Sequence, residues 1–209
     1  MCVAGIVVWK SQRRGLDMST GSVRRVNSAE PQSLRFPELG PVLLSAAELA
    51  ETVAGLGARI ATDYADLNPL MVGVLRGAFV FMADLARAIP ISVEVDFMAV
   101  SSYGQATESS GVVRILKDLD TDITGRHVIL VDEIIDSGLT MNYVRRLLSD
   151  RGAASVEVCA LLVRESVSHV DTSTLRYLGR TIPADWVVGY GLDTAQKWRN
   201  LPDVRLWNG

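Results

Sequence analysis

The sequence is poor in cysteine, in surplus charge of one sign and in long apolar runs, and each shortage excludes a class of protein. Its 209 residues include only two cysteines, Cys2 and Cys159, too few for a disulfide framework or a cysteine-rich zinc site. The formal net charge of −3 provides no broad basic field, which argues against tight, sequence-independent binding of nucleic acid. The apolar stretch Met1–Trp9 is far too short to span a bilayer. With 48% hydrophobic and 22% charged residues, the composition is typical of a soluble globular protein. We expect a reducing, cytoplasmic location and no membrane contact.

The first 38 residues differ in composition from the rest of the chain. After Met1–Trp9, serines and glycines are interspersed with basic residues, among them Lys10, Arg13, Arg14, Arg24 and Arg25. This pattern is typical of a disordered basic leader, and a true start at Met18 is an equivalent explanation. A targeting segment is the alternative. We expect a disordered leader at 1–38 and one folded domain at 39–209.

Helical and extended patterns alternate along that domain. Ser45 is placed to cap an amphipathic helix that runs to about Leu67, where Asn68–Pro69 stops it. Apolar runs and helical spacing then predict strands at 70–75, 91–103, 112–117, 127–131 and 155–163, and helices at 78–89 and 139–148. This order indicates an α/β fold with a mostly parallel twisted sheet flanked by helices. The segment from Arg176 onward is short and irregular, which is typical of a small flap.

Ligands of such sheets bind beyond the carboxyl ends of the strands, which makes Arg76–Gly77, Asp132–Thr140 and Arg164–Val167 the candidate stretches. The most informative is VILVDEIIDSGLT at 128–140, where a buried strand delivers two acids, a third follows, and a helix opens. Backbone N–H groups at a helix start, with a glycine and two hydroxyls, predict a phosphate site. The carboxylates must then bind sugar hydroxyls, a metal ion or a proton.

This stretch is open to two other interpretations. A strand ending in Asp-Glu is also typical of a Walker-B element, but the chain has no Gly-x-x-x-x-Gly-Lys-Ser/Thr sequence to accompany it. A helix cap accounts for Asp136 or Ser137 alone. It does not account for three acids, a glycine and two hydroxyls within nine residues.

The stretch 128–140 resembles the signature of type I phosphoribosyltransferases, which bind 5-phosphoribosyl pyrophosphate (PRPP). Other stretches resemble hypoxanthine-guanine phosphoribosyltransferases of that family in the same order: a pyrophosphate loop and helix at 75–89, a flexible lid with its flanking strands at 95–104 and 111–119, and a purine-binding hood at 186–193. The resemblance covers about 41–204. It implies the type I phosphoribosyltransferase fold, with a core at about 68–165 and a small hood from about 39–67 and 170–209.

The resemblance also implies the reaction, transfer of 5-phosphoribosyl from PRPP to a purine base with release of pyrophosphate. By resemblance, Asp132 and Glu133 hold the ribose hydroxyls, and Asp136 lies by purine N7 as general acid/base. The 5′-phosphate is assigned to the four residues that follow: Ser137, Gly138, Leu139 and Thr140.

Four further roles follow from the resemblance. Arg76, Gly77 and Arg199 meet pyrophosphate, and Asp193 anchors Mg²⁺, which prefers few protein ligands plus substrate oxygens. Ser102–Tyr103 belongs to the lid, which closes during turnover. The purine contacts are Arg164, Trp186 and the backbone of Val187, with Trp186 stacking on the ring. Core packing is the alternative for Trp186.

The chain departs from the family pattern in four places. The acid pair runs Asp-Glu instead of the usual Glu-Asp, Arg76 and Arg164 stand where lysine is usual, and Thr194–Lys197 after Asp193 is divergent. Arginine and lysine are not interchangeable at a defined contact. These departures leave the phosphoribosyl transfer intact and put the identity of the base in question.

Three functions therefore compete. The first is a salvage enzyme that makes IMP or GMP from hypoxanthine or guanine. The second keeps the transfer but uses xanthine or a modified purine such as a 7-deazapurine. The third is a non-catalytic regulator that binds nucleotide and RNA, against which the retained Asp136 and Asp193 and the lack of a basic face count. The resemblance implies a homodimer or homotetramer with no nucleic-acid partner.

Overall fold

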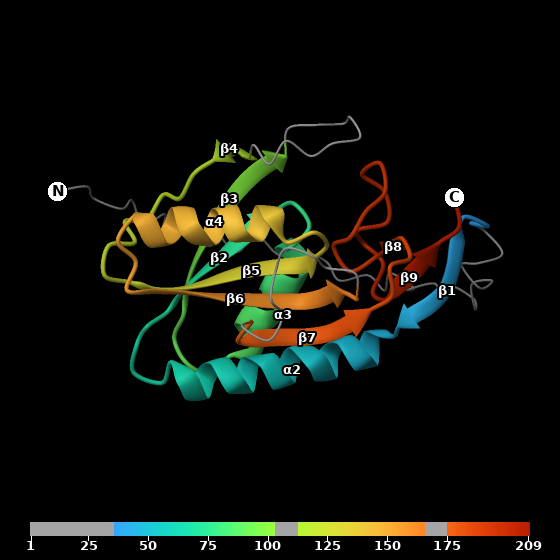
Figure 1. Cartoon of the computed structure of the whole chain (residues 1–209). Coiled ribbons are helices and arrows are strands. Elements are labelled where there is room, and N and C mark those ends of the chain that lie inside the picture. The colour runs from blue at the N-terminus through green and yellow to red at the C-terminus, as the bar shows by residue number, and fades with distance from the viewer. Residues whose placement is uncertain (1–35, 103–112, 166–174) are drawn as a thin grey trace, which may run out of the picture.

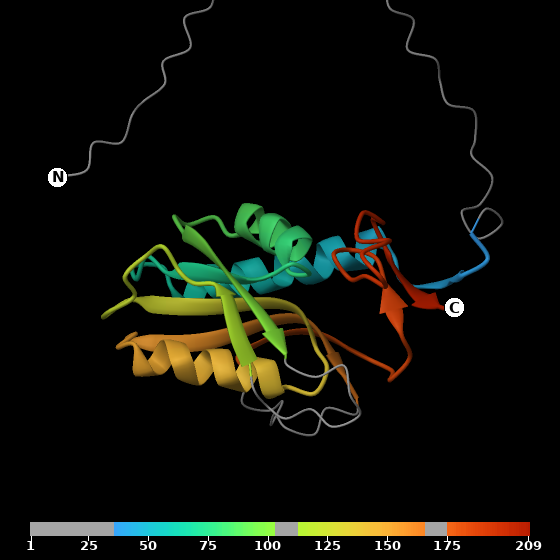
Figure 2. The ribbon, with the colours of Figure 1, turned by 90° about the horizontal axis from the view of Figure 1, so that it is seen from above.

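The computed structural model describes residues 36–102, 113–165 and 175–209. Within these ranges the chain forms a six-stranded sheet flanked by helices and a three-stranded sheet at one end (Figures 1 and 2). Residues 1–35 of the predicted leader and most of the predicted lid, including Tyr103, lie outside the described residues.

The main sheet confirms the predicted fold class. Its strands lie in the order β4-β3-β2-β5-β6-β7, and all neighbours run parallel except β3 and β4. The bounds are β2 Leu70–Leu75, β3 Glu94–Ser102, β4 Val113–Lys117, β5 His127–Ile135, β6 Ser155–Arg164 and β7 Tyr177–Ile182. The central strands are nearly continuous apolar runs because helices cover both faces.

Helices α2 (Ala46–Asp63) and α3 (Phe79–Ala88) pack on one face of the sheet, and α4 (Leu139–Asp150) packs on the other (Figure 1). Ser45 caps α2 as predicted, in a reciprocal arrangement with Glu48. The predicted end of this helix was wrong, because α2 ends at Asp63 and a turn leads to Leu67. The residues before Pro69 leave the helical region, and Asn68 has a φ of 43°.

The small sheet combines the two ends of the described chain. β1 (Leu39–Leu44), β9 (Val204–Trp207) and β8 (Val187–Val188) pair antiparallel in the order β1-β9-β8. Two elements assigned to the hood by sequence lie elsewhere. The apolar stripe of α2 packs into the main core, and β7 pairs with β6 as the sixth strand of the main sheet. The hood limits of 39–67 and 170–209 were therefore wrong for α2 and β7.

Strand β5 is longer than predicted and carries the acid pair within it. It continues four residues past Val131 because β6 continues beside it, pairing as far as Ile135 with Val163. Asp132 and Glu133 therefore lie inside a paired strand instead of in the loop after it. Their backbone positions are fixed by the sheet.

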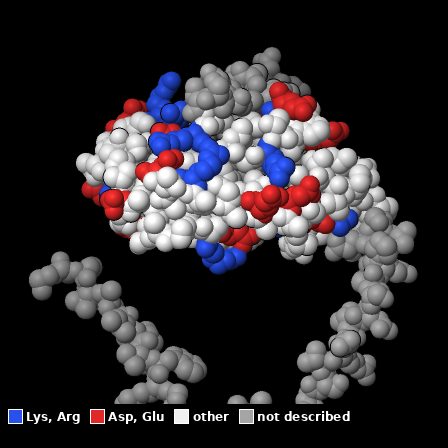
Figure 3. Space-filling view, turned by 90° about the horizontal axis from the view of Figure 1, so that it is seen from below, with Lys and Arg blue, Asp and Glu red and all other residues white. Residues whose placement is uncertain are grey.

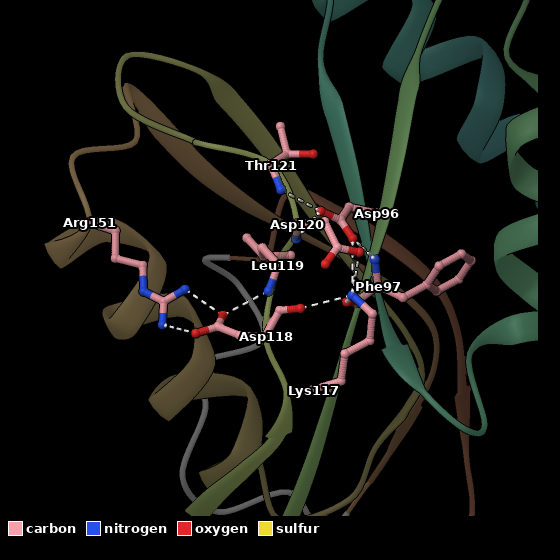
Figure 4. A network of polar contacts seen from close by, with 8 residues as sticks. All are labelled: Asp96, Phe97, Lys117, Asp118, Leu119, Asp120, Thr121 and Arg151. Carbon is pink, nitrogen blue, oxygen red and sulfur yellow. Dashed lines mark hydrogen bonds and ion pairs between the residues drawn. The ribbon is translucent and has the colours of Figure 1, made fainter. Parts of the chain in front are cut away.

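A polar network joins β3 to the loop that follows β4 (Figure 4). Asp96 is only 7% exposed, and its carboxylate accepts hydrogen bonds from the backbone N–H groups of Phe97, Asp120 and Thr121, at 2.7, 2.9 and 3.1 Å. The Nζ of Lys117 lies 3.5 Å from the same carboxylate. Burial pushes the pKa of Asp96 upward, but these hydrogen bonds outweigh it and hold the pKa below its ordinary value.

The same network reaches α4. Arg151, just past the end of that helix, donates through both terminal nitrogens to Asp118, at 2.6 and 2.7 Å (Figure 4). Such a bidentate pair fixes geometry as well as charge. The β3–β4 pair, the loop after it and α4 are therefore held as one unit.

Candidate functional site

The candidate stretches meet at one edge of the main sheet, where β2, β5 and β6 end next to the small sheet (Figures 1 and 2). Arg76 and Gly77 follow β2, Asp136 follows β5, and Arg164 is the last residue of β6. The carboxyl ends of parallel strands gather loops that are distant in sequence. This edge is the candidate active site.

The turn from β5 into α4 forms the predicted phosphate pocket. Gly138 precedes α4 with a φ of 81°, a left-handed conformation that glycine adopts without steric cost, and it offers no side chain to cap the helix. The first-turn N–H groups therefore keep their capacity to bind an anion. A hollow of about 170 Å³ lies here, lined by backbone and side chains from Asp132 to Gly138 with Thr140 and Met141.

The acid pair lies at the entrance to this hollow in a poorly solvated setting. Burial, reinforced by the charge of Glu133, raises the pKa of Asp132 well above its ordinary value. Burial likewise raises the pKa of Glu133, opposed by the hydrogen bond from Asp132. The Oε2 of Glu133 is buried and has no hydrogen-bond partner among the described residues. A buried carboxylate oxygen without a donor, next to a second carboxylate, forms a site for hydroxyl groups or for a cation.

Gly77 is at its position because Glu133 leaves no room for a side chain. A Cβ on Gly77 would lie 1.6 Å from Glu133 Oε1 and 2.1 Å from its carboxyl carbon. The loop after β2 therefore packs its backbone directly on the acid pair of β5. The sequence predicted a role for each residue but did not predict that they touch.

Two arginines and one carboxylate gather next to this contact. Arg199 Nη2 lies 2.6 Å from Asp193 Oδ1, with both side chains largely shielded from solvent. Arg76 and Arg199 both donate to the side-chain oxygen of Gln196, at 3.0 and 3.4 Å. The structure thus brings together Arg76, Gly77, Asp193 and Arg199, the four residues predicted to handle pyrophosphate and metal.

The predicted purine contact Arg164 lies against the turn from β5 into α4. Arg164 is 8% exposed, and its Nε lies 2.6 Å from Asp136 Oδ1. Its Nη1 donates to the carbonyl oxygens of Pro183 and Asp185 before β8. N7 and O6 lie on the same edge of a purine. The pairing of Asp136 with Arg164 is the arrangement expected if these groups share that edge.

Trp186 and Val187 stand at the start of β8 and differ in exposure. Trp186 is 56% exposed and Val187 is 3% exposed. The exposure of Trp186 excludes core packing, the alternative weighed from the sequence. Val187 pairs with Leu206 of β9, and the Trp186 carbonyl accepts from Trp207 N–H.

The donor chemistry of the site fits a magnesium ion. Magnesium binds through one or two carboxylates together with substrate phosphates and water. Asp193 and the unpartnered Glu133 Oε2 supply such oxygens, and Asp193 is near enough to influence the pKa of Glu133. Among the described residues, no group of three or more histidine, cysteine, aspartate or glutamate side chains is arranged to hold a metal.

Of the two predicted lid residues, the structure describes only Ser102. Ser102 ends β3 and pairs with Val113 of β4, while Tyr103 lies outside the described residues. Gln196 and the carbonyls of Pro183 and Asp185 were missed by sequence reasoning. Only the divergence of Thr194–Lys197 pointed at Gln196, and backbone carbonyls carry no sequence signal.

Comparison with known proteins agrees with this geometry. The family model described as "Phosphoribosyl transferase domain" matches residues 43–195. A hypoxanthine-guanine phosphoribosyltransferase from Mycobacterium tuberculosis is 44% identical over 188 residues, covering 87% of this chain and 93% of the relative. The corresponding protein of Bacillus subtilis is 46% identical over 167 residues, covering 80% and 92%.

Solved structures of similar proteins share the fold. A hypoxanthine-guanine phosphoribosyltransferase from Bacillus anthracis superposes with a TM-score of 0.77 at 41% identity, covering 81% of this chain and 99% of the other. A hypoxanthine phosphoribosyltransferase from Staphylococcus aureus gives a TM-score of 0.80 at 36% identity, covering 85% and 96%. In the described part of this chain, no helix has the length and apolar character needed to cross a membrane.

Proposed function

Because this chain belongs to the phosphoribosyl transferase family, we propose that it transfers the 5-phosphoribosyl group of PRPP to a 6-oxopurine. The acceptor is hypoxanthine or guanine, and the products are IMP or GMP and pyrophosphate. This is a reaction of purine salvage. The proposal rests on the family relationship and on three parts of the site. These are a pocket for the 5′-phosphate, cations for the leaving pyrophosphate, and a polar pair for the edge of the base.

The phosphate and ribose of PRPP belong at the turn from β5 to α4. We assign the 5′-phosphate to Ser137, Gly138, Leu139 and Thr140, which lead into α4 beside a small hollow. Asp132 and Glu133 accept hydrogen bonds from the ribose hydroxyls. A ribose hydroxyl is the donor that Glu133 Oε2 lacks, which supports the assignment.

Displacement at C1′ passes through an oxocarbenium-like centre, as in glycoside hydrolysis. The protein must then hold the base in line, neutralise the departing pyrophosphate and exclude water. We assign the leaving group to Arg76, Gly77 and Arg199, which converge on one side of the acid pair. Ser102 and Tyr103 are proposed as lid residues.

Asp136 is the proposed general acid/base at purine N7. It is the nearest carboxylate to Arg164, and its side chain is 69% exposed at the site, so a base can reach it. It takes or shares the proton at N7 as the bond to C1′ forms. Trp186 stacks on the base, and the backbone of Val187 contacts its exocyclic edge.

Magnesium is the proposed helper, held by Asp193 with oxygens of pyrophosphate. When bound, it neutralises charge on the leaving group. The residues of the chain provide the rest of the cradle. Arg199 pairs with Asp193 at 2.6 Å and thereby fixes the orientation of that carboxylate.

The observation that carries the proposal is the contact of Asp136 with Arg164 at the end of β6. A fixed cation beside a carboxylate matches the O6 and N7 edge of a 6-oxopurine. Xanthine or a modified purine such as a 7-deazapurine remains the second candidate, because Arg164 stands where the family usually has lysine. A 7-deazapurine has no N7, so it offers Asp136 no ring nitrogen there.

The test is a direct assay. Purified protein is incubated with PRPP, Mg²⁺ and each of hypoxanthine, guanine, xanthine, adenine and a 7-deazapurine, and the nucleotide formed is identified by mass. Formation of IMP or GMP at the highest kcat/KM supports the first candidate. Preference for xanthine or the 7-deazapurine replaces it with the second, and absence of any nucleotide with every base rejects both.

We further propose a cytoplasmic homodimer or homotetramer whose ligands are PRPP and the base. A mostly apolar pocket of about 600 Å³ is lined by α2, α3 and the segment 190–202, with Ala46, Ala50 and Ala54 exposed at it. It supports self-association because exposed apolar surface favours burial. Light scattering during size-exclusion chromatography measures the mass. A monomer at micromolar concentration contradicts this proposal. Residues 36–38 of the predicted leader are part of the fold, because Phe36 packs on Trp198 and the Glu38 carbonyl accepts from Asn208 N–H. Residues 1–35 are proposed to be dispensable for activity.

A further inference from the structure

The segment 193–199 carries an unusual backbone. Thr194 and Lys197 exchange two backbone hydrogen bonds, at 3.4 and 3.0 Å. Three residues in this tight loop have positive φ without being glycine: Ala195, Gln196 and Trp198, at 49°, 67° and 75°. Such conformations are costly for residues with a side chain and cluster at functional sites. The strain therefore has to be offset by what the loop places, and Gln196 is at its tip.

Gln196 is the point at which three proposed ligand-binding residues meet. Its Oε1 accepts a hydrogen bond from Arg76 Nη1 at 3.0 Å and one from Arg199 Nη2 at 3.4 Å. Its backbone N–H donates to Asp193 Oδ2 at 2.8 Å. The other oxygen of Asp193 already pairs with Arg199. One exposed glutamine thus contacts two cations and the carboxylate between them.

The charges explain why a shared acceptor is needed. The guanidinium groups of Arg76 and Arg199 come from positions 123 residues apart in the chain, and they repel each other when they converge. A neutral carbonyl oxygen offers both a hydrogen bond without adding charge. A carboxylate at the same place would attract both cations more strongly and would repel a phosphate.

We propose that Gln196 is a positioning residue for pyrophosphate. Its amide oxygen occupies the place of a phosphate oxygen between Arg76 and Arg199 in the resting site, and it yields that place when PRPP or pyrophosphate binds. Because the amide is neutral, a phosphate can displace it easily. Because its oxygen is a good hydrogen-bond acceptor, it holds the guanidinium groups of Arg76 and Arg199 close together until then. This inference rests on the proposed function, since it assigns a role within the same site.

Two variants of Gln196 test whether its hydrogen-bond acceptor, and not the shape of the loop, orders the two arginines. Gln196→Met keeps the unbranched stem and removes the acceptor, so ordering of the two arginines is lost before binding. We expect the dissociation constant of magnesium pyrophosphate and the KM for PRPP to rise about tenfold, with kcat and the KM for the base changed less than about twofold. Gln196→Glu keeps the acceptor and adds a charge that competes with phosphate, so it should weaken pyrophosphate at least as much as Gln196→Met.

Asn200→Ala is the matched control, because it truncates an exposed neutral amide of the adjoining segment and should leave these constants unchanged. Binding of magnesium pyrophosphate is measured by calorimetry, and kinetics by steady-state assay. Thermal unfolding of each variant checks that it folds, and Gln196→Ala replaces Gln196→Met if the latter does not. Unchanged pyrophosphate binding in the acceptor-less variant overturns the inference, as does a Gln196→Glu variant that binds like the parent.

Failure of the proposed function can be distinguished from failure of the role proposed for Gln196. If the parent forms no nucleotide with any base, the function is rejected whatever Gln196 does. If the parent turns over and binds pyrophosphate while the acceptor-less variant matches it, only the role of Gln196 is rejected. Equal losses in kcat and in the KM values for both substrates would indicate general loop damage and would also overturn the positioning role.

Discussion

Asp136 and Arg164 form the contact to which we assign recognition of the base. Neither residue is near the other in sequence, and each comes from the end of a different strand of the main sheet. Arg164 is buried and is held by carbonyl oxygens of the segment before β8, whereas Asp136 is largely exposed. The arginine is therefore the fixed partner of the pair, and the carboxylate is the one that is free to meet a substrate.

Replacement of Asp136 by asparagine should remove the proton acceptor and keep the shape. We expect kcat to fall by roughly 10²-fold or more, since general acid–base groups contribute on that order, while the KM for PRPP changes little. Steady-state kinetics with the preferred base provide the measurement. Turnover equal to that of the parent would remove Asp136 from the mechanism.

Arg164 should impose the choice between 6-oxopurines and adenine. Its guanidinium has no acceptor, so the 6-amino group of adenine meets a donor, and discrimination on the order of 10²-fold in kcat/KM is expected. Arg164→Met should erase this preference, whereas Arg164→Lys, which keeps a cation, should preserve it. Steady-state kinetics of the parent, Arg164→Met and Arg164→Lys on hypoxanthine, guanine and adenine measure this preference. Efficient use of adenine by the parent would show that Arg164 does not contact the base edge.

Arg164→Lys also separates the two candidate acceptors. In an enzyme for hypoxanthine or guanine, lysine restores the contact usual in the family, so activity on those bases should hold or improve. In an enzyme adapted to a modified base, lysine should damage use of that base and raise activity on guanine or hypoxanthine. A loss on every base tested would mean that the carbonyl contacts of Arg164 matter more than its charge.

The loop after β2 and the strand β5 act together because their atoms are in direct contact. Gly77 has no side chain where Glu133 Oε1 approaches, and the loop beyond it carries Arg76 toward Gln196. The register of β2 with β5, in which Leu70 pairs with Val128 and Gly73 with Val131, sets this approach. A local change in either element therefore alters both the acid pair and the pyrophosphate cradle.

Gly77→Ala should accordingly disable binding of PRPP. A methyl group 1.6 Å from a carboxylate oxygen forces either the loop or Glu133 to move, and we expect the KM for PRPP to rise by about 10²-fold or more. Gly55→Ala in α2 is the matched control, because no atom lies within 4 Å of its added Cβ. That change should leave kinetics alone and stabilise the protein by about 0.5–1 kcal/mol. Equal kinetics for both variants would contradict the predicted clash.

The network around Asp96 should make stability sensitive to acid. Its pKa is held below the ordinary value by backbone hydrogen bonds despite burial, so its contribution to stability is present above about pH 4 and is lost as the pH falls through the lowered pKa. Asp96→Asn should lower the free energy of unfolding by about 1–3 kcal/mol at pH 7. The difference in this free energy between variant and parent should become smaller toward pH 3. Urea unfolding at several pH values measures this.

Asp120→Asn is the control for that experiment. Asp120 pairs with Lys117 at 3.0 Å, but its side chain is 84% exposed, and exposed ion pairs contribute about 0–1 kcal/mol. A loss at pH 7 as large as that of Asp96→Asn would mean that the backbone contacts of Asp96 are not what stabilises the loop.

The molecule as a whole places its site between two sheets. Strands β2, β5 and β6 lead to residues proposed to bind pyrophosphate, ribose, 5′-phosphate and the base, while β8 and the segment 189–201 carry the other proposed residues (Figures 1 and 2). On the face that α2 covers, basic and acidic side chains are interspersed (Figure 3). Arg59 of α2 and Arg176 lie over the ring of Tyr177, whose hydroxyl donates to Asp63 at 2.6 Å.

A ligand that bridges the two sheets should stabilise both of them. At about 100 times its dissociation constant, a ligand adds about 2.7 kcal/mol to the free energy of unfolding. Nucleotide with magnesium pyrophosphate should therefore slow hydrogen exchange at amides of β5 and α4 and also at those of β8 and β9. Hydrogen-exchange mass spectrometry measures this. Protection confined to one sheet would contradict a shared site.

Local patterns were sufficient for the three described helices, for five strands of the main sheet, for the α/β class and for the stretch Asp132–Thr140, but not for β1, β7, β8 and β9. Periodicity, caps and the glycine of a phosphate turn are encoded by neighbours in sequence. Even so, β5 is longer than its apolar run, because extension depends on the strand beside it. For the same reason β7 was mistaken for part of a flap.

The contacts that make the site came only from the tertiary structure. Arg164 with Asp136, Gly77 with Glu133, and Arg76 with Gln196 join residues from different loops. Strand order and register decide which loops become neighbours, and these depend on how whole elements pack, not on any local pattern. The sequence thus named the chemical groups of the site, and packing of the sheet decided which of them touch.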